Sequence, residues 1–364
     1  MKIELDAPVV GELEKKYLNE AIDKGFVSSF GPFIPEFEKR ISGFLGVKGA
    51  VAVGSGTAAM HMSLYALGIG KGDEVIVPSL TFAASINPIL YVDATPVIVD
   101  VDIGTWNMDP ERVQEAITDR TKAIIPVHLY GNPCDMDKIK MIARENGIYV
   151  IEDAAESLGA KVEGKQTGTL GDMGVLSFNG NKLITTGGGG MVVSDDIERM
   201  EYIRYLANQA KDQHRPGFHG EIGFNFRMTN IQAALGLAQF EQINKFLRKK
   251  KSFKEIYRDV LGDISYIGFQ DNRGSEESAW LSCIKIDKEF DIEILMKDLK
   301  NKGIPTRRIF LPLGEMPYLS EYSLNCPCAH EIYERGLCLP SSMLNSEEDI
   351  KTVASTIKEV IADE

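Results

Sequence analysis

One rhythm organises residues 49 to 195: a run of β-branched residues, a polar or glycine-rich turn, and a segment with helical periodicity. The runs are residues 75–77, 96–99, 123–127 and 149–151, and helices are expected over 57–67, 110–117 and 136–146. Asp109 and Asp135 stand where the last two helices need N-caps. Strands alternating with helices predict an α/β protein whose mainly parallel sheet is covered on both faces and binds ligands at its carboxyl edge.

The pattern changes after Ser194, where helices are expected over residues 197–209 and 230–261. From about residue 265 the chain is typical of a smaller α+β unit, with a strand over 280–286 and helices over 292–300 and 347–362. A length of 364 residues fits two folding units. We therefore predict a large domain over residues 1–245 and a small domain over 246–364, joined by the long helix.

Charge excludes several classes of partner. The chain has 40 basic and 53 acidic residues and a net charge of −13, whereas a general nucleic-acid or membrane-surface binder needs a basic face. The basic cluster of residues 248–251 with Lys254 is predicted to be a solvated helix face. Residues 75–92 carry no charge, but their prolines and polar side chains favour a buried strand and helix over a membrane span.

The remaining compositional features point to a cytoplasmic protein. The N-terminus has acidic residues where a signal peptide needs basic and then apolar ones. The five cysteines are too few and too scattered for a disulfide framework, so we expect them to be reduced. Cys326 and Cys328 have no second pair at zinc-like spacing, and no metal site is predicted.

Three local features point to chemistry. Residues 54–59, Gly-Ser-Gly-Thr-Ala-Ala, follow an expected strand and open an expected helix, where free backbone amides can bind an anion. Asp153 ends a nearly continuous apolar strand, where a carboxylate is poorly hydrated and needs a partner. Lys182 lies between small polar residues and precedes the four glycines of residues 187–190, which let the backbone pack closely around its amine. A lysine desolvated in this way readily forms a Schiff base with a carbonyl.

Each feature alone also fits an ordinary structural role: a glycine turn, a helix cap or a solvated loop lysine. Together, however, they match the needs of a single cofactor. Pyridoxal phosphate (PLP) requires an anion site for its phosphate, a carboxylate for its pyridinium nitrogen and a lysine for its aldehyde. The sequence therefore predicts a PLP-dependent enzyme.

The order of these motifs resembles a known family. Five short motifs occur in the order seen in the nucleotide-sugar aminotransferases of the DegT/DnrJ/EryC1/StrS group. They are Gly56-Thr57, Thr81-Phe82, Glu152 to Glu156, Asn181-Lys182 and residues 223–230. The resemblance covers nearly the whole chain. It implies fold type I of the PLP-dependent transferases, as in aspartate aminotransferase, with a large sheet domain and a smaller C-terminal α+β domain.

The resemblance implies roles at the cofactor ring for four residues. Lys182 would form the internal aldimine and carry protons during the reaction. Asp153 would bind the pyridine nitrogen and keep it protonated, which makes the ring an electron sink. Glu156 would lie near the ring hydroxyl, and Phe82 would cover one face of the ring.

The resemblance also implies how the phosphate and the substrates bind. Gly56, Thr57 and Ser177 would hold the phosphate together with Asn225 of the neighbouring subunit. The active unit would therefore be a homodimer with shared active sites. The residues expected to contact substrate are Asn181, Arg227, Arg307 and Arg308.

The reaction implied by the resemblance is a transamination in which glutamate is the donor and 2-oxoglutarate the product. Residues 179–190, with Gly188 where many relatives have an acid, look most like enzymes acting at C4 of UDP-linked 4-keto-6-deoxy-N-acetylhexosamines. Residues 105–110 and 128–137 look equally like the GDP-perosamine synthases. We predict a nucleotide-sugar 4-aminotransferase of bacterial surface polysaccharide or glycan biosynthesis, with a UDP sugar favoured and a GDP sugar as the alternative.

Three other functions are compatible with this family resemblance. One is amino transfer to C3 of the sugar. The second is a sugar dehydrase of the same fold, but its relatives carry histidine in place of the lysine, so Lys182 argues against it. The third is a non-catalytic regulatory protein, which would show gaps in the site, and the sequence shows none.

Overall fold

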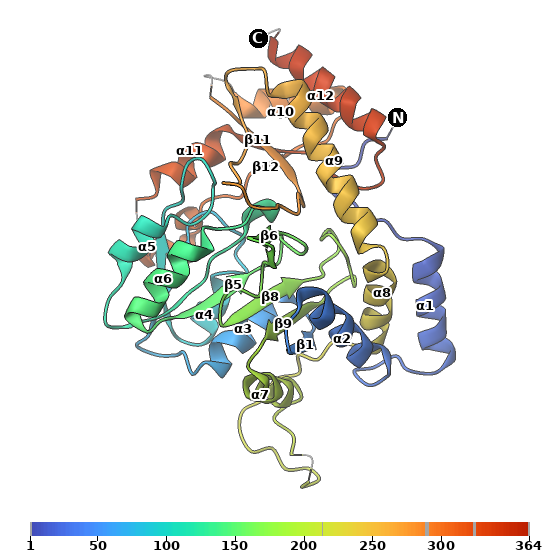
Figure 1. Ribbon diagram of the computed structural model, residues 1–364, viewed down its shortest axis with the longest axis vertical. Helices are drawn as coiled ribbons and strands as arrows, with labels where there is room; N and C mark the ends of the chain where they lie inside the picture. Colours follow the sequence, from blue (N-terminus) through green and yellow to red (C-terminus); the bar gives the residue numbers. More distant parts are fainter. Residues whose placement is uncertain (1, 213, 288–290, 323–324, 363–364) are drawn as a thin grey trace.

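The computed structural model describes residues 2–212, 214–287, 291–322 and 325–362 (Figure 1). A seven-stranded sheet in the order β1-β9-β8-β5-β4-β2-β3 forms the centre of the larger unit. Strands β3, β2, β4, β5 and β8 run parallel, whereas β9 is antiparallel to both of its neighbours. The α/β class and the mainly parallel sheet are thus confirmed. The strands are β1 Gly49–Val53, β2 Glu74–Pro78, β3 Thr95–Val99, β4 Thr121–Ile124, β5 Tyr149–Asp153, β8 Met173–Ser177 and β9 Gly190–Ser194.

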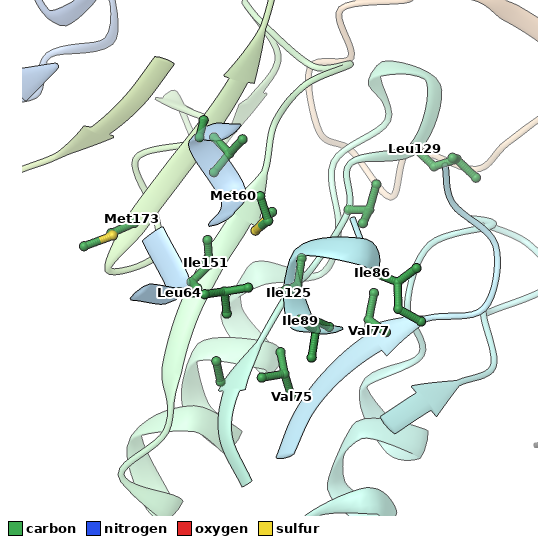
Figure 2. Packing of buried hydrophobic residues seen from close by; sticks show 14 of the residues in the cluster. Met60, Leu64, Val75, Val77, Ile86, Ile89, Ile125, Leu129, Ile151 and Met173 are labelled. Carbon is green, nitrogen blue, oxygen red and sulfur yellow. The ribbon is translucent and has the colours of Figure 1, made fainter. Parts of the chain in front are cut away.

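Both faces of this sheet are buried. Alternate residues of a strand point to opposite sides of the sheet, and on each side they pack into an apolar cluster. Val51 and Val53 of β1 belong to one apolar cluster, and Ala50 and Ala52 belong to another. Figure 2 shows the first cluster, in which side chains of the central strands meet those of the covering helices. The helices of this unit are α1 Glu12–Asp23, α2 Phe33–Leu45, α3 Gly56–Ala66, α4 Asn87–Tyr91, α5 Pro110–Ala116, α6 Met136–Asn146, α7 Ile197–Ala207 and α8 Asn230–Phe240.

Some helix boundaries are set by capping residues next to them in the sequence. Asp109 and Asp135 accept hydrogen bonds from the backbone N–H groups of Glu111 and Lys138, so both predicted N-caps are confirmed. The uncharged stretch 75–92 forms β2 and α4, as expected. Among the residues described, no helix combines the length and apolar character needed to cross a bilayer.

The helix predicted over residues 230–261 is instead two helices, α8 and α9 (Ile243–Leu261). The chain leaves helical geometry at Gln242, whose backbone has φ −102° and ψ 1°. The Gln242 side chain donates to Glu14 of α1 at 2.8 Å, and Gln239 donates to the same carboxylate at 2.7 Å. This buried acid lies far away in the sequence, so helical periodicity alone does not reveal the break.

The smaller unit contains an antiparallel sheet in the order β10-β11-β13-β12, packed against helices that include α9 and α12. In Figure 1, α9 runs from α8 up to this unit. The N-terminal segment also reaches it, because the Ser341 N–H donates to the Leu5 carbonyl and Ile3 joins its apolar core. The elements are β10 Ile267–Gly268, β11 Ser282–Ile286, β12 Arg307–Arg308, β13 Gly336–Leu339, α10 Ile292–Asn301, α11 Pro327–Arg335 and α12 Glu347–Ala362.

The basic cluster of α9 is only in part the solvated face that its composition predicts, because Arg248 is exposed but two of the lysines are buried. Lys250 and Lys254 are only 3% and 4% exposed. Lys250 Nζ donates to the carbonyls of Trp280 at 2.8 Å and Ser341 at 2.6 Å, and Lys254 forms a buried ion pair with Glu277. Segments distant in sequence cover this side of the helix, so the lysine stems are buried and their amines find partners there.

Lys250 should change how stability depends on pH. Burial lowers the pKa of Lys250 from 10.5 to about 7. Between these values the unfolded chain keeps the lysine proton while the folded chain releases it, so this residue makes stability rise with pH, by up to about 1.4 kcal/mol per unit. Lys250→Met, which keeps the stem but does not titrate, should remove this contribution. Denaturant unfolding of the wild type and of Lys250→Met at pH 7, 8 and 9 measures this contribution. Equal slopes of the unfolding free energy against pH in the two proteins would contradict the prediction.

Candidate active site

A cavity of about 350 Å³ lies where β5 and β8 end and α3 begins. It is therefore at the carboxyl edge of the sheet, where ligands of α/β proteins bind. The small unit contributes Trp280, Arg307 and Phe310 to its wall. The sequence-predicted residues that line the cavity are Gly56, Thr57, Phe82, Asp153, Glu156, Ser177, Asn181, Lys182 and Arg307.

One end of the cavity is the N-terminus of α3. Ser55 caps this helix by accepting a hydrogen bond from the Ala58 N–H at 3.0 Å. The first N–H groups of a helix have no partner within the helix and point outward, where they bind anions. Strand β9 passes so close that a Cβ atom on Gly190 would lie 2.4 Å from the Ser55 carbonyl. The glycine run therefore lets this strand pack against the proposed anion site.

Asp153 is held in a defined orientation at the end of β5. One carboxylate oxygen accepts a hydrogen bond from Ser85 Oγ at 2.7 Å, and this hydroxyl lies 2.8 Å from Thr81 Oγ1. The other oxygen accepts from the Ala155 N–H at 3.1 Å. Asp153 is 7% exposed and lines the cavity, so the carboxylate can face a cationic ring nitrogen with little competing water.

Lys182 lies between a carboxylate and an aromatic ring. Its Nζ is 3.3 Å from Glu156 Oε1 and 3.8 Å from the centroid of the Trp280 ring. Glu156 Oε2 accepts a second hydrogen bond, at 2.8 Å from the Tyr130 N–H. Burial raises the pKa of Glu156, and the nearby Lys182 partly opposes this shift. The site thus holds a primary amine and a carboxyl group in contact, away from bulk water.

Arg307 supplies positive charge to the cavity. Its Nη1 donates to Asp6 Oδ2 at 3.1 Å, and the same oxygen accepts from Asn181 Nδ2 at 2.9 Å. Its Nη2 is buried and has no hydrogen-bond partner among the described residues. This nitrogen is shielded from solvent and does not open onto the cavity, although Arg307 forms part of the cavity wall.

Three predicted residues do not reach the cavity of this chain. Asn225 and Arg227 are exposed, and Arg227 donates to Ser29 at 2.6 Å. Arg308 does not line the cavity; it donates to the Tyr333 carbonyl at 2.7 Å, and its guanidinium lies over the ring of the same tyrosine.

Other residues of the site were not identified from the sequence. Ser85, Trp280, Phe310 and Asp6 all contact it, yet they come from four separate segments. None of them lies in a local motif, and only the motif Thr81-Phe82 pointed to the loop that carries Ser85. Their roles depend on long-range folding.

The cavity fits PLP on observations of this chain. An anion site at the start of α3, an oriented carboxylate at Asp153 and the amine of Lys182 all line one cavity. The space between the start of α3 and the end of β8 is narrow, since a Cβ atom on Gly56 would lie 3.1 Å from the Ser177 side chain. Arg307 adds a positively charged residue to the cavity wall.

Comparisons with known proteins point to one family. Residues 8–358 match the model of the DegT/DnrJ/EryC1/StrS aminotransferase family. The GDP-perosamine synthase of Escherichia coli O157:H7 is 41% identical over 96% of each chain, and that of Caulobacter vibrioides is 40% identical over 99% of this chain and 98% of its own. A Streptococcus pneumoniae protein described as a sugar aminotransferase, solved in its PLP form, has a TM-score of 0.94 at 27% identity, covering 99% of this chain and 98% of its own.

These similarities extend over nearly the whole chain and not only over the motifs of the site. They confirm the resemblance, the PLP-transferase fold, the aminotransferase activity and the cofactor predicted from the sequence. The chain belongs to the DegT/DnrJ/EryC1/StrS family of PLP-dependent aminotransferases.

Proposed function

We propose that this aminotransferase moves the amino group of glutamate to the C4 ketone of a nucleotide-linked 4-keto-6-deoxyhexose, and that the nucleotide is GDP. The observation that carries the proposal is the meeting of Lys182, Asp153 and the start of α3 in one cavity. The GDP assignment is supported by two GDP-perosamine synthases that are 40% and 41% identical over nearly full length. The UDP-linked N-acetyl sugar favoured by residues 179–190 is the second candidate.

In this proposal PLP supplies an electron-withdrawing ring that stabilises negative charge on the carbon next to the transferred nitrogen. Lys182 binds the cofactor and moves the proton at that carbon. Asp153 pairs with the ring nitrogen, and Ser85 and Ala155 hold the Asp153 carboxylate in place. The amides at Gly56 and Thr57 bind the phosphate.

The substrates of this reaction are anions, although the chain carries a net charge of −13. Arg307 is a source of local positive charge, because this residue lines the cavity. A planar guanidinium can bind a carboxylate or phosphate group through two hydrogen bonds. We therefore assign Arg307 to an anionic group of a substrate.

A homodimer with shared sites is part of the proposal. Asn225, expected to reach the phosphate of a neighbouring subunit, is exposed. Large apolar side chains are also exposed nearby in sequence, Phe218 at 45% and Ile222 at 75%. Exposed apolar surface of this kind is typical of protein contacts. We place the dimer in the cytoplasm, in the biosynthesis of a bacterial surface polysaccharide or glycan.

The test is to incubate the PLP-loaded protein with glutamate and either GDP- or UDP-linked 4-keto-6-deoxy sugars. The measured products are 2-oxoglutarate and the aminated nucleotide sugar, identified by mass spectrometry, with Lys182→Ala as the control. We expect both products with the GDP-linked sugar. Turnover of the UDP-linked sugar alone would overturn the GDP assignment, and turnover of neither would overturn the proposed reaction. Light scattering of the same sample measures the dimer.

A further inference from the structure

We propose that Trp280, a residue of the small unit, positions the Lys182 amine for proton transfer. The inference rests on the proposed role of Lys182. The indole ring lies 3.8 Å from Lys182 Nζ, and the indole Nε1–H donates to the carbonyl of Asn181 at 2.8 Å. Trp280 therefore contacts two consecutive residues, one through the backbone and the other through the reactive amine.

These two contacts define the position of the amine. Glu156 Oε1 lies 3.3 Å from Nζ, and the face of the Trp280 ring provides a second neighbour. An ammonium group is attracted to the negative face of an indole ring as well as to a carboxylate. In the PLP-loaded protein, Glu156 and Trp280 would therefore hold the Lys182 side chain in one place, in the ammonium form that gives its proton back.

The indole is itself held in place. The backbone carbonyl of Trp280 accepts a hydrogen bond from the buried Lys250 Nζ at 2.8 Å, and the indole ring stacks on Tyr130 with the centroids 6.3 Å apart. The chain passes so close to Gly131 that a Cβ atom there would lie 3.0 Å from the Trp280 N–H nitrogen. A residue whose backbone is held by Lys250 and Gly131 and whose ring is held by Tyr130 can orient a neighbour without reorganising during the reaction.

Packing alone would also explain a buried tryptophan, since Trp280 is 2% exposed and belongs to an apolar cluster. The chain contains two tryptophans, and the other, Trp106, is equally buried in the same cluster but does not line the cavity. Trp106→Phe is therefore a matched control. It should lower stability without changing proton transfer, whereas a change at Trp280 should affect both.

The experiment follows single turnovers of the PLP-loaded protein with glutamate and with glutamate deuterated at Cα. In Trp280→Phe, which keeps an aromatic ring and loses the N–H donor, we expect the rate to fall about tenfold. In Trp280→Leu we expect a loss of about a hundredfold. The deuterium isotope effect should rise in both variants. The glutamate concentration that gives half of the maximal rate should stay within about twofold of the wild-type value. Wild-type rates and isotope effects in both variants would overturn the proposal, as would the same change in Trp106→Phe.

A second measurement separates this inference from the proposed function. The cofactor-free proteins are mixed with PLP, reduced with borohydride and digested, and the adduct on Lys182 is followed by mass spectrometry. We expect slower formation of this adduct in Trp280→Leu than in Trp106→Phe, and equal rates in the two would overturn the role of Trp280. An adduct found on a lysine other than Lys182 in the wild-type protein would overturn the proposed site.

Discussion

Replacing Lys182 by alanine is expected to abolish transamination. The variant loses both the amine that binds PLP and the group that moves the substrate proton, 3.3 Å from Glu156. Proton transfer by a positioned side chain alone contributes a factor of about 10² to 10⁴, so the loss should be at least this large. The conversion of PLP-loaded protein by glutamate, followed by the visible absorbance of the cofactor, measures the rate.

Two additions make the Lys182 experiment specific. Lys165→Ala, which changes an exposed lysine on the hairpin β6 (Lys161–Val162) and β7 (Lys165–Gln166), should leave the rate unchanged. A small primary amine added to Lys182→Ala should restore part of the activity, because the truncation leaves space beside Glu156 and Trp280. A rate above about a tenth of wild type in Lys182→Ala without added amine would refute the assignment.

The second large effect is expected for Asp153→Asn. Asparagine keeps the size of the side chain and can still accept from Ser85, but it is neutral and cannot hold a ring nitrogen in its protonated form. Removing one preorganised electrostatic partner of a developing charge typically costs about 10² to 10³ in rate. We expect that loss in the glutamate half-reaction, measured in single turnovers.

Ser85→Ala provides the graded control for Asp153. It removes one hydrogen bond to the carboxylate and leaves the other, from the Ala155 N–H at 3.1 Å. The expected loss is about tenfold, in line with one hydrogen bond to a charged group. If Asp153→Asn stays within threefold of wild type, or is less affected than Ser85→Ala, the carboxylate does not serve the ring nitrogen.

Elements governed by local sequence were predictable. Helices α5 and α6 begin one residue after Asp109 and Asp135, because a capping carboxylate acts on N–H groups two or three residues away. The strands were visible as apolar runs because both faces of the sheet are buried. The prediction was wrong for the single helix over residues 230–261 and for two lysines of the basic cluster, since Gln242 and Lys250 bind groups that are distant in sequence.

The sequence by itself determined the α/β fold, the family and the cofactor, since each depends on residues close together in the chain or on the order of short motifs. Only the tertiary structure brought Asp6, Trp280 and Arg307 to the loop of Lys182. These residues come from the N-terminal segment and from the small unit, so neither periodicity nor spacing connects them to Lys182. Their contacts depend on how the small unit packs over the carboxyl edge of the sheet, where burial gives single hydrogen bonds and ring contacts their effect.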